Sequence, residues 1–170
     1  RLLLGVLVVL GLPMLLLVPI VVVAAHLANR SLGGSLPETG ALANPVMIPA
    51  LFGVFLVLQV GEEFGWRGYA LDAVQAGAGA AEAGAIVGCC WVLWHLPMFM
   101  IPGFGLHSAG VPFGQYAVTL ICLSVVMAWL QNNTGGSLLP AFVVHAQINL
   151  TGEVLPLQGG TDALFGQSTW

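Results

Sequence analysis

Long apolar stretches, separated by short polar connections, make up most of this sequence of 170 residues. A helix of about 20 apolar residues is long enough to cross a hydrocarbon core of about 30 Å. Charged residues account for only 6% of the chain and hydrophobic residues for 58%, whereas roughly a quarter of an ordinary soluble domain is charged. The sequence therefore predicts an all-α fold: a polytopic transmembrane helical bundle with about five spanning helices.

Polar or Gly- and Pro-bearing connections set the boundaries of the five helices. We expect the helices at residues 2–28, 46–60, 84–100, 114–131 and 138–155, and the second of them continues from residue 60 into the polar stretch that follows. The organisation follows as an N-terminal transmembrane helix and loop (1–44), a core (45–157) and a C-terminal tail (158–170). Gly84 and Gly88 have the four-residue spacing that lets membrane helices pack closely. Because the chain enters an apolar run at Arg1 without a methionine, we expect it to be a piece of a longer protein.

Charge and cysteine content narrow the expected partners. The net charge is −4, with no lysine and no basic cluster, so nucleic acid is not an expected partner. The three cysteines, Cys89, Cys90 and Cys122, lie in apolar helical stretches without metal-type spacing, and we expect them to be small buried hydrophobic residues. Membrane lipids are expected partners, and the bias toward alanine, glycine and valine favours a bacterial cell membrane.

The stretch "VGEEFGWRGY", residues 60–69, places two acids and an arginine directly after an apolar run. Glu63 lies one helical turn before Arg67, in the favourable order for an ion pair. Glu62 points about 100° away and is expected to lack that partner. A carboxylate in a medium of low dielectric constant has its charged form disfavoured, which is the direction that a general base requires. The alternative is that both acids anchor a helix end at the interface, but acids inside a membrane are costly unless they are used.

Two further polar clusters occur within expected helices. "WVLWHLP" carries His95, and "VVHAQIN" carries His145 and Asn149 four residues apart on one helix face. Counting 1.5 Å per residue from the expected helix ends puts Glu62 about 6 Å, His145 about 10 Å, and both His95 and Asn149 about 16 Å below one membrane face. Either histidine alone would more often be a packing residue. Together, four polar groups in one membrane half predict a shared, water-accessible cavity.

These three motifs resemble those of a known family. "EEFGWR" matches the EExxxR motif, "WVLWH" resembles the FxxxH motif and "HAQIN" matches the HxxxN motif of the CAAX protease and bacteriocin-processing (CPBP) intramembrane proteases. The resemblance covers residues from about 45 to 157. It implies a multi-spanning helical endopeptidase that hydrolyses peptide bonds near the membrane surface, and the best-known relatives remove the last three residues of prenylated CAAX proteins.

The same resemblance implies a role for each motif residue. Glu62 would activate water, His95 would help to position it, His145 and Asn149 would stabilise the oxyanion, and Glu63 with Arg67 would support the site. No cofactor is needed for this chemistry, and the substrate would be a peptide or protein, possibly lipidated. The sequence departs from the family pattern at Trp91, where the family has phenylalanine. We expect Trp91 to keep the packing role and to reshape the pocket, which would alter substrate preference more than chemistry.

Three alternatives compete with this interpretation. Glu62, His95 and His145 have the ligand types of a catalytic zinc site with water in the fourth position. We favour the metal-free mechanism, because a ligating Glu62 would leave the reaction without its base. A non-catalytic membrane immunity or scaffold protein would keep the motifs as a structural polar network. A small transporter or channel would need polar residues in both membrane halves, whereas here they cluster in one.

Overall fold

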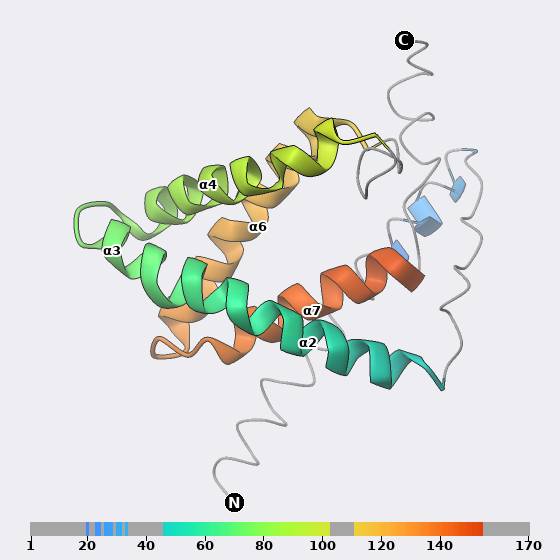
Figure 1. The fold of residues 1–170 in the computed structure, drawn as a ribbon, viewed down its shortest axis with the longest axis horizontal. Helices are drawn as coiled ribbons and strands as arrows, with labels where there is room; N and C mark the ends of the chain where they lie inside the picture. Colours follow the sequence, from blue (N-terminus) through green and yellow to red (C-terminus); the bar gives the residue numbers. More distant parts are fainter. Residues whose placement is uncertain are drawn as a thin grey trace, which may run out of the picture. The chain divides into compact units, whose positions relative to one another are not determined.

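The computed structural model describes residues 46–102 and 111–154, together with scattered positions between 20 and 33. The regular elements in the two long ranges are all helices (Figure 1): α2 Ile48–Gly65, the π-helix η1 Trp66–Ala70, α3 Leu71–Gln75, α4 Ala80–Met100, α6 Phe113–Asn133 and α7 Leu139–Val154. The predicted all-α class is confirmed. The span predicted at 2–28 lies outside these two ranges. The chain falls into two compact units, divided between Gln59 and Val60 and again between Phe142 and Val143, and each is described by itself.

The second predicted helix is much longer than expected, because α2, η1 and α3 form one continuous helix from Ile48 to Gln75. No proline interrupts it after the first turn, and the first glycine-rich break is the turn that follows Gln75. Glu62 therefore lies about 20 Å from the end of this helix, and His95 lies about 23 Å from the start of α4. The helix end predicted close to Glu62 is wrong, and the depth of Glu62 in the membrane stays a prediction. Because a short turn joins the two helices, these distances place Glu62 and His95 at a similar distance from that turn.

The turn between α3 and α4 is shorter than the sequence suggested. We predicted that the third helix would begin near Gly84, but α4 begins at Ala80, after Gly79 in an extended conformation. Alanine is the strongest helix former, so the alanine-rich segment extends the helix rather than forming a linker. Glu82 in the first turn adds a favourable interaction with the helix dipole.

Two glycines let α4 and α6 approach each other closely. A Cβ atom added at Gly84 would lie 3.0 Å from the Cα of Val125, and one at Gly88 would lie 2.9 Å from the Cα of Ile121. Ser124 uses this proximity, because its hydroxyl donates a hydrogen bond of 2.8 Å to the carbonyl of Gly84. The predicted role of the small-residue pair in close helix packing is confirmed.

The C-terminal end of α6 binds the helix that carries the acids. The Gln131 side chain donates a 2.9 Å hydrogen bond to the carbonyl of Arg67, and Asn132 donates one of 2.9 Å to the side chain of Gln75. Beyond α6 the chain turns through Gly135 and Gly136, whose φ angles of 67° and 79° favour glycine. This turn was predicted from the sequence.

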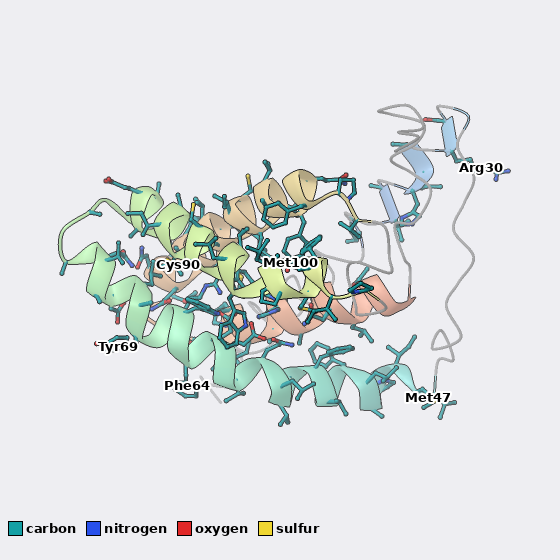
Figure 2. The ribbon with its side chains drawn as sticks, turned by 45° about the horizontal axis from the view of Figure 1, so that its top comes forward. Arg30, Met47, Phe64, Tyr69, Cys90 and Met100 are labelled. Atoms are coloured by element: carbon teal, nitrogen blue, oxygen red, sulfur yellow. The ribbon has the colours of Figure 1, made fainter. Side chains whose placement is uncertain are left out.

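Three helices in the described ranges are long and apolar enough to span a membrane: Ile48–Gln75, Ala80–Met100 and Phe113–Asn133. At most 33% of the most apolar part of each is buried within the protein. Large apolar side chains instead point outward, as Phe64 and Tyr69 do in Figure 2. Contact of such surfaces with lipid costs no free energy, whereas their exposure to water would be unfavourable. The protein is an integral membrane protein, although α7, at 16 residues, is shorter than these three spans.

The prediction that the cysteines are buried is wrong. Cys89, Cys90 and Cys122 are all exposed on the outer faces of α4 and α6. In a soluble protein, a cysteine within an apolar helix would be expected inside the core. In a membrane protein, apolar side chains can face either the lipid or the protein core. The apolar residues beside these cysteines in the sequence therefore did not indicate burial within the protein.

Candidate active site

Glu63 and Arg67 form a buried ion pair at the junction of α2 and η1. Arg67 Nη1 lies 2.9 Å from Glu63 Oε1, and the two side chains are 1% and 0% exposed. The pair predicted from the four-residue spacing is confirmed. Because each charge is removed from water, each helps to compensate the other.

The ion pair stands where the helix widens into one π-turn. The N–H of Leu71 donates a hydrogen bond to the carbonyl of Trp66, five residues earlier. The side chain of Gln131 donates a hydrogen bond to the carbonyl of Arg67. Single π-turns within α-helices occur frequently at functional sites. This one comes directly after the two acids and contains the arginine.

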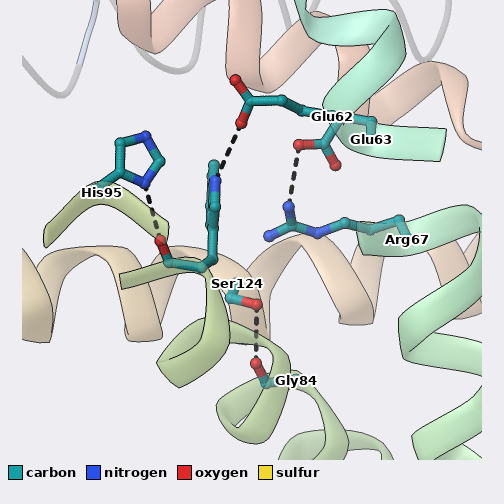
Figure 3. A network of polar contacts seen from close by, with 7 residues as sticks. Glu62, Glu63, Arg67, Gly84, His95 and Ser124 are labelled. Atoms are coloured by element: carbon teal, nitrogen blue, oxygen red, sulfur yellow. Dashed lines mark hydrogen bonds and ion pairs between the residues drawn. The ribbon is translucent and has the colours of Figure 1, made fainter. Parts of the chain in front are cut away.

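Glu62 is half-buried, and a residue from α4 holds its carboxylate. The indole N–H of Trp91 donates a hydrogen bond of 3.1 Å to Glu62 Oε2, shown among the polar contacts of Figure 3. Arg67 pairs with Glu63 rather than with Glu62, as expected, but the Glu62 carboxylate is not free, because it has a partner on another helix. Spacing along one helix identifies only partners on that helix, and Trp91 lies on a different helix, 29 residues along the chain.

Trp91 contacts both parts of the first motif. Its side chain is 1% exposed, and the guanidinium carbon of Arg67 lies 4.3 Å from the centroid of its ring. The edge of the indole thus meets Glu62 while its face meets Arg67, in a cation–π contact. Trp91 therefore does more than pack, since it also binds a carboxylate of the first motif. Its effect on substrate preference stays a prediction.

His95 lies one helical turn after Trp91 and is half-buried. Its Nδ1 atom lies 2.8 Å from the carbonyl oxygen of Trp91. A carbonyl can only accept, so Nδ1 carries the proton, and in the neutral ring Nε2 is left as an acceptor. The hydrogen bond that Trp91 donates to Glu62 therefore brings the carboxylate beside the helical turn that carries His95 (Figure 3).

Tyr116 of α6 was not predicted as part of the site. Its ring centroid lies 5.6 Å from that of His95 and 5.0 Å from that of Phe99. These contacts fix the side of the imidazole that faces α6. The signal in the sequence was a phenol in the first turn of a helix that has no charged side chain.

The third motif lies on α7. His145 is buried and Asn149 is half-buried, and both belong to the compact unit that does not contain Glu62 and His95. The meeting of His145 and Asn149 with the first two motifs stays a prediction.

The zinc alternative also requires His145 of the third motif to lie close to Glu62 and His95. Among the described residues of the unit Val60–Phe142, no three His, Cys, Asp or Glu side chains form a group that could hold a metal ion. The proposed ligand set takes its third ligand, His145, from the other unit. Zinc binding therefore also stays a prediction.

Comparison with known proteins places these motifs in a family. The sequence model of the family described as type II CAAX prenyl endopeptidase Rce1-like matches residues 43–151, a range that contains all three motifs. The chain belongs to this family. The CAAX prenyl protease 2 of Methanococcus maripaludis is 27% identical over 154 residues, which cover 86% of this chain and 56% of that protein. The chain thus spans little more than half the length of this curated relative. No solved structure matches the chain.

Proposed function

We propose that this member of the family is an intramembrane endopeptidase in which Glu62 activates water. The observation that carries the proposal is the 3.1 Å hydrogen bond that fixes the Glu62 carboxylate against α4, one turn from His95. A general base must be held within hydrogen-bond reach of the proton that it takes. The buried Glu63–Arg67 pair next to it supplies a rigid support for that position.

The reaction needs only side chains of this protein and water. Glu62 takes a proton from water while oxygen attacks the carbonyl carbon of the scissile peptide bond. The carbon–nitrogen bond then breaks, and the protonated Glu62 returns the proton to the departing amine. Nε2 of His95 accepts a hydrogen bond from the water and orients it. His145 and Asn149 donate to the oxyanion, the role that the family resemblance implies for them.

The proposed substrates are membrane-associated or lipidated peptides and proteins. The apolar helix surfaces around the site give a lipid-modified chain access from the bilayer, and the M. maripaludis relative bears the name of a prenyl protease. We therefore propose that a prenylated C-terminal peptide is one substrate class, that the membrane is a bacterial cell membrane, and that cleavage takes place near the membrane surface.

Cleavage of a peptide panel by the purified protein in detergent tests the proposal. The panel contains one peptide sequence with and without a farnesyl group, and products are measured by mass spectrometry. Wild type is expected to cleave, and Glu62→Gln to give no detectable product, because a positioned base supplies about 10²–10⁴-fold. Asn149→Ala is expected to leave a trace, since one oxyanion donor supplies about 10²–10³-fold.

Glu82→Gln is the matched control, because Glu82 is an exposed acid in the first turn of α4, away from the motifs in sequence. It should cleave as wild type does. Wild-type turnover in Glu62→Gln would refute the assignment of the base. Loss of wild-type turnover in the presence of a chelator, with recovery on adding Zn²⁺, would replace the metal-free mechanism by the zinc-dependent one.

A further inference from the structure

We propose that Trp91 is the positioning residue for Glu62, and that Arg67 acts on the base through the indole ring. The proposal deepens the proposed function and rests on it where activity is measured. It assigns to the tryptophan a task that phenylalanine at the same position cannot perform, because phenylalanine has no N–H group.

The indole is held in one orientation on several sides. Its side chain is 1% exposed, the guanidinium of Arg67 covers one face at 4.3 Å, and its own backbone carbonyl is bound to His95. A tryptophan side chain has two rotatable bonds, so these contacts fix the direction of the N–H group. Glu62 has three rotatable bonds and is only half-buried. The hydrogen bond from a fixed donor therefore selects one of its rotamers.

Arg67 strengthens this hydrogen bond. A cation over an indole face draws electron density from the ring, which makes the N–H group a better donor, and the acceptor is a carboxylate. The four side chains form a series of contacts: Glu63 binds Arg67, Arg67 stacks on Trp91, and Trp91 donates to Glu62. The second acid and the arginine of the EExxxR motif thereby act on the first acid without touching it.

The two oxygens of the Glu62 carboxylate therefore have different roles. Trp91 donates to Oε2, so Oε1 is the oxygen that would hold the water. Removing the indole N–H releases the carboxylate to other rotamers, and the reactive one is then populated for a smaller fraction of the time. The chemical step should slow while substrate binding stays the same.

The first test measures kcat and KM for Trp91→Phe and for Trp94→Phe. Trp94 lies three residues further along α4 and its side chain is 65% exposed, so its substitution removes an indole without touching Glu62. We expect kcat of Trp91→Phe to fall about tenfold, because hydrogen bonds to charged groups are the stronger ones, with KM within about twofold of wild type. Trp94→Phe should match wild type in both constants.

The second test does not depend on activity. The full chain, with ¹⁵N-labelled tryptophan, gives one indole N–H signal for each of its five tryptophans, and Trp91→Phe identifies the signal of Trp91. In Glu62→Gln this signal should move upfield, because a neutral amide is a weaker acceptor than a carboxylate. In Glu82→Gln it should stay in place. Phenylalanine substitution of each of the other four tryptophans in turn identifies the same signal by elimination. The measurement therefore stands on chains with an intact Trp91, even where Trp91→Phe folds poorly.

The outcomes separate the two proposals. An indole signal of Trp91 that is the same in Glu62→Gln and wild type overturns the positioning role, as does wild-type kcat in a folded Trp91→Phe. A wild-type protein that cleaves no peptide overturns the proposed function instead, and the indole signal then decides by itself whether Trp91 holds Glu62.

Discussion

Arg67 is the side chain on which the buried charges of the described site depend. It compensates Glu63 at 2.9 Å and lies over Trp91 at 4.3 Å, and all three side chains are buried. Removing one partner of such a pair leaves a buried charge without compensation, which costs more than the pair itself contributes. At the residue scale, the sequence spacing was sufficient to predict the pair but not the aromatic ring beside it.

We expect Arg67→Met to lower the free energy of unfolding by about 3–5 kcal/mol, measured by thermal denaturation in detergent. The double variant Glu63→Gln/Arg67→Met should recover part of this loss, since it removes both charges. Arg30→Met is the control, because Arg30 is exposed, and it should leave the midpoint unchanged. A single Arg67→Met variant as stable as wild type would show that the pair is not isolated from water.

Two features of the helices position Glu62, Trp91 and His95. The π-turn at Trp66–Ala70 lies next to the acids, and the contact of α4 with α6 sets the position of the face that carries Trp91 and His95. That contact depends on Gly88, where a Cβ atom would lie 2.9 Å from the Cα of Ile121. A backbone atom cannot move aside as a side-chain tip can, so α4 and α6 would have to separate.

Gly88→Ala is therefore expected to destabilise the protein by about 1–3 kcal/mol, the usual cost of overpacking. The midpoint of thermal denaturation in detergent measures this effect. Gly114→Ala on α6 is the matched control, because nothing lies within 4 Å of its added Cβ, and it should be neutral or slightly stabilising. Equal midpoints for the two variants would mean that close packing at Gly88 does not stabilise the contact.

At the scale of the whole molecule, the bilayer surrounds apolar side chains that a soluble protein would bury in its core. Val57, Trp94 and Val118 are among the apolar side chains that are more than half exposed on the three long helices. Because lipid is as apolar as a protein core, these side chains need not be buried within the protein. Cys89, Cys90 and Cys122 are exposed near the middle of α4 and α6, where the lipid would cover them.

In membrane vesicles the three cysteines are expected to resist a charged, water-soluble thiol reagent, because the reactive thiolate does not form in hydrocarbon. The same reagent should label them after the membrane is dissolved in detergent. Gly77→Cys, in the exposed turn between α3 and α4, provides the control and should react in both conditions when the reagent has access to both sides. Rapid labelling of the native cysteines in intact vesicles would contradict a lipid-facing position.

The sequence by itself determined the helical membrane class, the Glu63–Arg67 pair, the close contact at Gly84 and Gly88, and the family. Each of these depends on composition, on motifs or on residues a turn apart, where helix geometry fixes which side chains are neighbours. Only the tertiary structure decided that Glu62 has a partner, that the partner is Trp91, and that Tyr116 adjoins His95. These contacts join different helices, and no local spacing encodes the rotation of one helix against another. The length of the second helix was also decided only by the tertiary structure, because an alanine- and glycine-rich stretch can either end one helix or begin the next.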